Sequence, residues 1–192
     1  MLKQSSIVRK MTDTIYQFSY KALNPDIKID PNTDFKGKVV LIESVDSNWG
    51  FTKGNYKDLN QLHNKYHASG LVIVTQPCNQ FPTPLLGTER EPENGTCLLN
   101  SITKKFKPEW KFILDKADVK GPNAHPLFNF LKTHPNCQAN DPWWIGGKKD
   151  EINWNFTKFL IDRKGVPRSR FSPNVNPMAM EEDIKKLLDE SA

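Results

Sequence analysis

Long apolar runs are absent from this chain, and no stretch approaches the about 20 apolar residues that a membrane-spanning helix requires. The first ten residues carry Lys3, Arg9 and Lys10 without an acidic residue, and they lack the apolar core of a secretory signal. Both absences argue against a helical membrane protein and against a secretion signal. Residues 1–12 are expected to form a flexible extension, with a short organellar transit segment as the alternative.

Cysteine is scarce as well, since Cys78, Cys97 and Cys137 are the only three in the chain. An odd number of thiols, without the spacing of a metal motif, argues against a disulfide framework and against a zinc site. The simplest interpretation is a reduced protein of the cytoplasm, with the mitochondrion as the alternative. No bound cofactor and no metal are expected.

The charge balance excludes fewer classes of function than the scarcity of cysteine does. The chain holds 27 basic and 22 acidic residues, a net charge of +5, which favours anionic ligands or an acidic membrane surface as partners. No basic helix and no stripe of alternating basic and aromatic residues is present, so nucleic acid is not an expected partner. A length of 192 residues suits one domain, which is expected over residues 13–192.

The most informative stretch is a strand–turn–helix–strand pattern. An apolar, β-branched run at Val39–Ile42 is followed by a polar turn, by a stripe of apolar residues with helical spacing, and by a second apolar run at Leu71–Val74. Such a βαβ unit predicts two parallel strands, with Leu41 and Val72 buried in adjacent strands. In folds of this kind chemistry sits at the carboxyl end of the first strand, which here is Ser47–Gly50.

Apolar spacing elsewhere completes an α/β prediction. Asn123 is expected to cap one of the later helices. Two long loops, over residues 76–95 and 134–150, interrupt the pattern. The remaining elements are predicted as a β-hairpin over residues 13–29, helices over 97–106, 124–131 and 180–188, a short strand at 112–114, and an antiparallel pair of strands within 153–162 and 166–171.

Four segments together resemble the glutathione peroxidase family. Val45-Asp46-Ser47-Asn48-Trp49-Gly50-Phe51-Thr52 matches the frame of the family's turn Val-Ala-Ser-x-Sec/Cys-Gly-x-Thr, except that tryptophan stands at the position of the reactive selenocysteine or cysteine. The other three are Pro77–Phe81, Asn123–Phe128 and Trp154–Leu160, in the family's order. The resemblance implies a thioredoxin-like fold, with a central mixed sheet flanked by helices.

The resemblance also implies the site. Trp49 occupies the position of the nucleophile, Pro84 that of a hydrogen-bonding glutamine, and Trp154 and Asn155 match the family's tryptophan and asparagine. Indole offers no ionisable nucleophile, and proline offers neither a side-chain donor nor a backbone N–H. Two of the four site positions are therefore expected to be chemically disabled.

Other candidates are weighed beside these. The helix that carries a resolving cysteine in some members has none here at Ser101–Phe106, so a disulfide relay is not expected. Cys78 is interpreted as a structural thiol, and His125 as a capping or packing residue. Trp143 and Trp144 either form a contact surface for a membrane or a protein or fold back on the domain.

The nominal function that follows is thiol-dependent reduction of hydrogen peroxide or lipid hydroperoxides, in defence against oxidative stress, with glutathione or another thiol as reductant. The chain as written is expected to be catalytically impaired. Three alternatives remain open: a non-catalytic binding module, an active selenoprotein whose selenocysteine codon UGA is read as Trp49, and a thiol activity based on Cys78.

Overall fold

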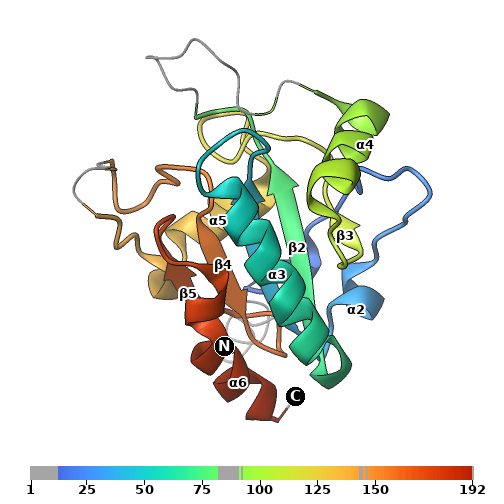
Figure 1. The fold of residues 1–192 in the computed structure, drawn as a ribbon. Helices are drawn as coiled ribbons and strands as arrows, with labels where there is room; N and C mark the ends of the chain where they lie inside the picture. Colours follow the sequence, from blue (N-terminus) through green and yellow to red (C-terminus); the bar gives the residue numbers. More distant parts are fainter. Residues whose placement is uncertain (1–12, 82–90, 92, 143–144, 146, 192) are drawn as a thin grey trace.

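A computed structural model describes residues 13–81, 91, 93–142, 145 and 147–191 (Figure 1). Three of the expected features lie outside these described residues: the extension over residues 1–12, Pro84, and the pair Trp143 and Trp144. The expectations for them stay predictions.

A five-stranded mixed sheet in the order β3-β2-β1-β4-β5 forms the centre of the protein. The parallel strands β1 and β2 place Val40 opposite Val72, and β2 is parallel to β3. The predicted βαβ unit is therefore confirmed, although Val72 is partly rather than fully buried. The strands are β1 (Val39–Val45), β2 (Leu71–Pro77), β3 (Phe112–Ile113), β4 (Lys158–Ile161) and β5 (Pro167–Phe171), with β4 antiparallel to both β1 and β5.

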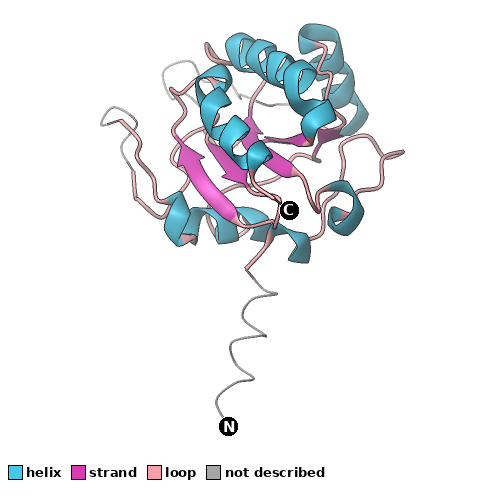
Figure 2. Cartoon of the chain, turned by 90° about the horizontal axis from the view of Figure 1, so that it is seen from below, coloured by secondary structure: helices cyan, strands magenta, loops and turns pink. Residues whose placement is uncertain are grey.

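Helices cover both faces of this sheet (Figure 2). On one face α3 lies over the strands, with α4 and α6 beside it (Figure 1), and their apolar stripes share one core cluster. Tyr56, Leu59 and Leu62 supply the buried stripe of α3, as their spacing predicts. The helices are α2 (Pro31–Asp34), α3 (Thr52–Tyr66), α4 (Gly95–Phe106), α5 (Pro126–Thr133) and α6 (Glu181–Asp189), with 3-10 turns at Ile15–Gln17, His67–Ser69, Pro135–Cys137 and Pro177–Met180.

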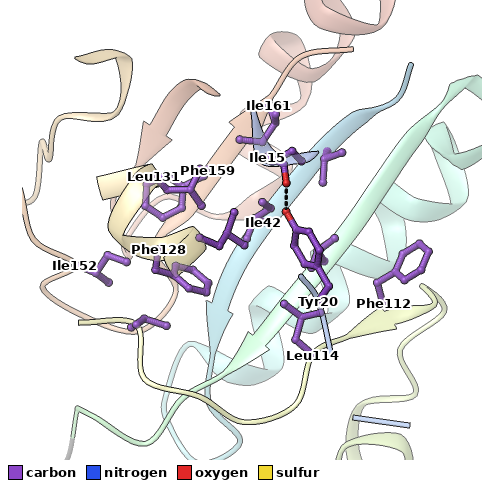
Figure 3. Close-up of a cluster of buried hydrophobic side chains, with 14 of the residues drawn as sticks. Ile15, Tyr20, Ile42, Phe112, Leu114, Phe128, Leu131, Ile152, Phe159 and Ile161 are labelled. Atoms are coloured by element: carbon purple, nitrogen blue, oxygen red, sulfur yellow. Dashed lines mark hydrogen bonds between the residues drawn. The ribbon is translucent and has the colours of Figure 1, made fainter. Parts of the chain in front are cut away.

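The second core cluster lies on the opposite face, under α5 and the N-terminal segment (Figure 3). Phe128 and Leu131 of α5 meet Ile42 of β1 there, while Leu41 points to the first cluster. Successive residues of β1 thus serve opposite cores, and all seven of its residues are buried. This explains why its sequence is a continuous apolar run and not an alternating one.

The predicted N-terminal β-hairpin is wrong. Residues Ile15–Gln17 form a 3-10 turn, and the only strand-like pairing within the segment is a single antiparallel bridge between Lys21 and Lys28. Ile15 and Tyr20 are buried, and the Tyr20 hydroxyl donates to the Ile15 carbonyl at 2.7 Å (Figure 3). The apolar residues that suggested strands fill the core from an irregular segment.

Two element boundaries also differ from prediction. The His125 ring, not Asn123, caps α5, because its Nδ1 accepts from the Leu127 amide at 3.2 Å. Strand β4 begins at Lys158 and not at Asn153. The reason is local backbone geometry, since Phe156 has φ +63°, a left-handed conformation that interrupts extended structure.

A buried ion pair joins β1 to the neighbouring strand β4. Glu43 lies opposite Lys158 of β4, both side chains are fully buried, and Lys158 Nζ is 3.6 Å from Glu43 Oε1. Lys158 Nζ also donates to the Pro173 carbonyl at 3.2 Å. Burial raises the pKa of Glu43 to about 7, opposed by the charge of Lys158, and burial lowers the pKa of Lys158. Each charge is therefore tolerated inside the core only because of the other.

We expect Glu43→Ala to lower the free energy of unfolding by about 3–5 kcal/mol at pH 8, because Lys158 would remain buried without its partner. The paired change Glu43→Leu with Lys158→Met should return stability to within about 1 kcal/mol of the parent or above it. Urea denaturation of the three proteins measures this. A double variant no more stable than Glu43→Ala would show that the pair does not act as a unit.

Candidate functional site

The turn after β1 is organised by the carboxylate of Asp46, which is 1% exposed. Asp46 Oδ1 accepts hydrogen bonds from the backbone N–H of Asn48 at 3.1 Å and from the Thr52 hydroxyl at 3.0 Å. The same Thr52 oxygen accepts from the Trp49 amide at 3.0 Å. Two side chains thus fix the path of the chain from β1 into α3, and Trp49 lies just before the helix begins at Thr52.

The Trp49 side chain lies in a cluster of aromatic rings. Its ring centroid is 5.6 Å from that of Trp154, as expected from the sequence, and 4.4 Å from that of Phe51. Phe156 stacks on it at 5.8 Å, and Phe81 contacts Trp154 at 5.7 Å. The indole is partly buried, so an apolar side chain with one exposed surface fills the place where the resemblance locates the nucleophile.

Asn155 is close to the same turn but its amide is directed at Asp46. Asn155 Nδ2 donates to Asp46 Oδ2 at 2.8 Å, and the Asn155 side chain is fully buried. The segment is held against β1 by the main chain, where the Phe156 amide donates to the Ser44 carbonyl at 2.6 Å. The donor expected to serve position 49 therefore serves a carboxylate instead.

Sequence reasoning did not single out Asp46, although a signal was present. The family's turn carries alanine where this chain carries an acid, and an acid directly after a buried strand must find partners within reach. Its partner Thr52 lies in the same turn, but Asn155 is distant in the chain, so the sequence did not reveal that contact.

A second buried carboxyl group, Glu91, lies against the same turn and was also missed. Its Oε2 accepts from the Ser47 hydroxyl at 2.9 Å. Its main chain is held as well, because its amide donates to Asn79 Oδ1 at 2.9 Å and its carbonyl accepts from Lys116 Nζ at 2.8 Å. Burial, together with the charge of Asp46, raises the pKa of Glu91 to about 7.

The two buried thiols are poor candidates for a replacement nucleophile. Cys78 is fully buried, and burial raises its pKa to about 11. Cys137 is also buried, with its pKa raised to about 12. Cys97 is exposed near the start of α4, and all three thiols are free. A buried thiol with a raised pKa holds little thiolate at neutral pH, which argues against the Cys78 alternative.

Within the described part of the chain, no group of three or more His, Cys, Asp and Glu residues could hold a metal ion. None of the described helices is both long enough and apolar enough to cross a membrane. His125 acts as a helix cap, as anticipated. The position of Pro84 relative to Trp49 stays a prediction, because residue 84 lies outside the described ranges.

A family model described as glutathione peroxidase matches residues 15–132, which is more than half of the chain. The chain belongs to the glutathione peroxidase family. A "Probable phospholipid hydroperoxide glutathione peroxidase" of Nicotiana sylvestris is 41% identical over 176 residues, covering 91% of this chain and 93% of the relative. A "Probable glutathione peroxidase 3, mitochondrial" of Arabidopsis thaliana is 39% identical over 184 residues, covering 95% and 80%.

Solved structures agree with this assignment. The crystal structure of T. cruzi GPX1 is 35% identical, has a TM-score of 0.65, and covers 91% of this chain and 96% of its own. A thioredoxin-family thiol:disulfide interchange protein from Chlorobium tepidum shares only the fold, at 15% identity and a TM-score of 0.59, covering 91% and 95%. The thioredoxin-like fold implied by the sequence resemblance is confirmed.

The raised pKa of Glu91 predicts a pH-dependent contribution to stability. A carboxyl group whose pKa is higher in the folded than in the unfolded chain stabilises the fold while it is protonated. That contribution falls as the pH rises from the ordinary value of about 4.5 to about 7. Glu91→Gln keeps a neutral side chain at every pH. The variant should therefore gain stability over the parent between pH 5 and pH 8, by about 1–3 kcal/mol.

Urea denaturation of parent and variant at these two pH values measures the difference. Glu93→Gln is the matched control, because Glu93 is exposed and only two positions away. A Glu91→Gln difference that is the same at pH 5 and pH 8 would contradict the assignment.

Proposed function

We propose that this member of the glutathione peroxidase family keeps the fold as a binding module and does not reduce peroxides. The observation that carries the proposal is the Trp49 indole at the nucleophile position, packed between Phe51, Trp154 and Phe156. The names of the relatives support thiol-dependent reduction of hydroperoxides as the nominal family role. In this proposal the chain lacks the nucleophilic group that performs this reduction, because position 49 holds tryptophan.

Peroxide reduction requires a nucleophile that attacks one oxygen of the O–O bond and carries that oxygen away as a sulfenic or selenenic acid. A reducing thiol such as glutathione then removes it. Indole cannot take this role, because it has no ionisable group with an available electron pair at neutral pH. Positioning of the peroxide alone cannot supply the missing covalent step.

Asp46 adds a second obstacle, independent of Trp49. A thiol placed at position 49 would lie in the turn that the Asp46 carboxylate organises, and a negative charge in this turn disfavours formation of the thiolate. The same carboxylate accepts a hydrogen bond from the Asn155 side-chain amide, which is thereby engaged. The site is thus altered in its donors as well as in its nucleophile.

The surface left in place of catalysis is aromatic. Trp49, Phe51 and Trp154 are each partly exposed and lie side by side. Partly exposed aromatic side chains are common in contact surfaces, because they bury a large apolar area with little loss of conformational freedom. We propose that the ligand or partner of the binding module contacts this aromatic cluster.

A selenoprotein is the second candidate, and one observation favours it: tryptophan stands at the position where the family carries selenocysteine, whose UGA codon is one base from the tryptophan codon UGG. In that case the natural protein would be an active peroxidase using glutathione or a related thiol. The two candidates differ in the residue that the natural protein holds at position 49.

The compartment is proposed to be the cytoplasm, with the mitochondrion as the alternative. The scarcity and free state of the cysteines support a reducing compartment. Among the relatives, one is named mitochondrial and another chloroplastic. Fluorescence microscopy of the full chain with a C-terminal tag distinguishes these compartments.

Activity assays on recombinant protein with tryptophan at position 49 test the proposal. Consumption of NADPH, coupled through glutathione reductase, should not exceed the rate without protein, with either hydrogen peroxide or a lipid hydroperoxide. Trp49→Cys should gain slight activity. The double variant Trp49→Cys with Asp46→Ala should be more active than this single variant by about tenfold or more, because the negative charge that opposes thiolate formation is removed. Electrostatic changes at such a site alter rates on the order of a hundredfold.

Asp46→Ala alone is the control, since it alters the turn without adding a thiol. Thiol pKa values, measured from the pH dependence of iodoacetamide alkylation in the two proteins that carry Trp49→Cys, separate charge effects from unfolding. Robust turnover by the parent would refute the proposal. Equal activity and equal thiol pKa in the single and double variants would show that Asp46 is not an obstacle.

A further inference from the structure

A cavity of about 470 Å³ opens between the segment before α2 and the start of α4. One wall is formed by residues 20–23, 25 and 27–29, a second by Gly95 and Thr96, and a third by Asp115, just after β3. Its volume lies within the range of about 300–1,000 Å³ that is typical of small-molecule sites. None of its described lining residues belongs to the aromatic cluster or to the Asp46 turn, so it is a separate place on the molecule.

Two lysines face each other on the first wall. Lys21 and Lys28 are paired across the isolated antiparallel bridge, and residues directly opposite each other in such a pair project from the same face. Both line the cavity. Like charges in this arrangement repel unless an anion compensates them. A lysine pair at a cavity wall therefore favours a nearby anion.

Asp115 compensates only one of the two. Its Oδ2 lies 2.6 Å from Lys21 Nζ, whereas Lys28 forms no ion pair with any described residue. Among the described residues, Lys28 is therefore a positive charge of the wall without an ion-pair partner, which suits a ligand with a single negative charge.

The start of α4, on the second wall of the cavity, also favours a negatively charged ligand. The helix α4 begins at Gly95, and the side chain of its N-cap residue Asn94 makes no capping hydrogen bond. The first N–H groups of a helix attract anions through their free hydrogens and through the helix dipole. The exposed hydroxyl of Thr96 adds a further donor on this side.

The rest of the lining is apolar. Ala22 and Leu23 are buried beneath the cavity, and Ile27 and Ile29 are partly exposed beside it. Such a surface favours an aliphatic group and gives nothing to a purely hydrophilic ion. The cavity thus combines a positive end with an apolar body.

We propose that this cavity binds a small organic monoanion with an aliphatic tail, of the class of a medium-chain carboxylate. The carboxylate lies between Lys28 and the start of α4, and the tail lies along Leu23, Ile27 and Ile29. The site is independent of the proposed function at Trp49, because it shares no residue with it.

Octanoate, below its micellisation concentration, is the probe, and amide shifts in ¹H–¹⁵N spectra at fixed ionic strength are the readout. Saturable shifts are expected at Lys28, Gly95 and Thr96. Octanol, with the same tail and no charge, and acetate, with the charge and no tail, should each bind at least about tenfold more weakly. Equal binding of octanoate and octanol would overturn the proposal, as would octanoate shifts centred on Trp49 and Trp154.

Variants give the second test. Lys28→Gln should weaken octanoate binding about threefold to tenfold, while Lys36→Gln, the same change at an exposed lysine outside the cavity, should leave it unaltered. Thr96→Glu should abolish measurable binding, because its carboxylate takes the anion's place beside Lys28. An acid in the first turn suits the helix dipole, so this variant should fold with parent stability. Unchanged affinity in Lys28→Gln and Thr96→Glu would contradict the assignment.

Discussion

The Asp46 carboxylate joins the turn between β1 and α3 to the loop that carries Asn155, which is distant in the sequence. Removing a charge of this kind from water is costly, and it is tolerated because both carboxylate oxygens accept hydrogen bonds. The arrangement of Trp49 depends on it, since the Trp49 amide is held by the same Thr52 hydroxyl that donates to Asp46. The position of the aromatic cluster therefore depends on the hydrogen bonds of the Asp46 and Thr52 side chains.

These hydrogen bonds hold the turn in place whatever residue stands at position 49. The turn, the start of α3 and the approach of Trp154 all remain as the family frame implies. The turn holds an indole at the position that the resemblance gives to the nucleophile. Asp46 is buried in the same turn, and Glu91 brings a second acid against it through Ser47.

Much of the fold follows from local pattern, and much of the site does not. The βαβ unit is predictable because β1 is buried on both faces and α3 on one, which leaves a continuous run and a helical stripe in the sequence. The N-terminal hairpin prediction is wrong because Ile15 and Tyr20 are buried in the core from an irregular segment and do not belong to strands. The contact between Asp46 and Asn155 joins residues that are distant in the chain, so no local pattern reports it. The proximity of Trp49 and Trp154 follows only from the family resemblance, which aligns both positions at once.

The central claim is that tryptophan is the natural residue at position 49 and fills the site. The most direct measurement is the mass of the tryptic peptide from Val39 to Lys53, isolated from the organism that makes the protein. The account predicts the mass of the peptide with tryptophan. A peptide with the isotope pattern of selenium would contradict it, and would assign the protein to the active selenoenzymes of the family.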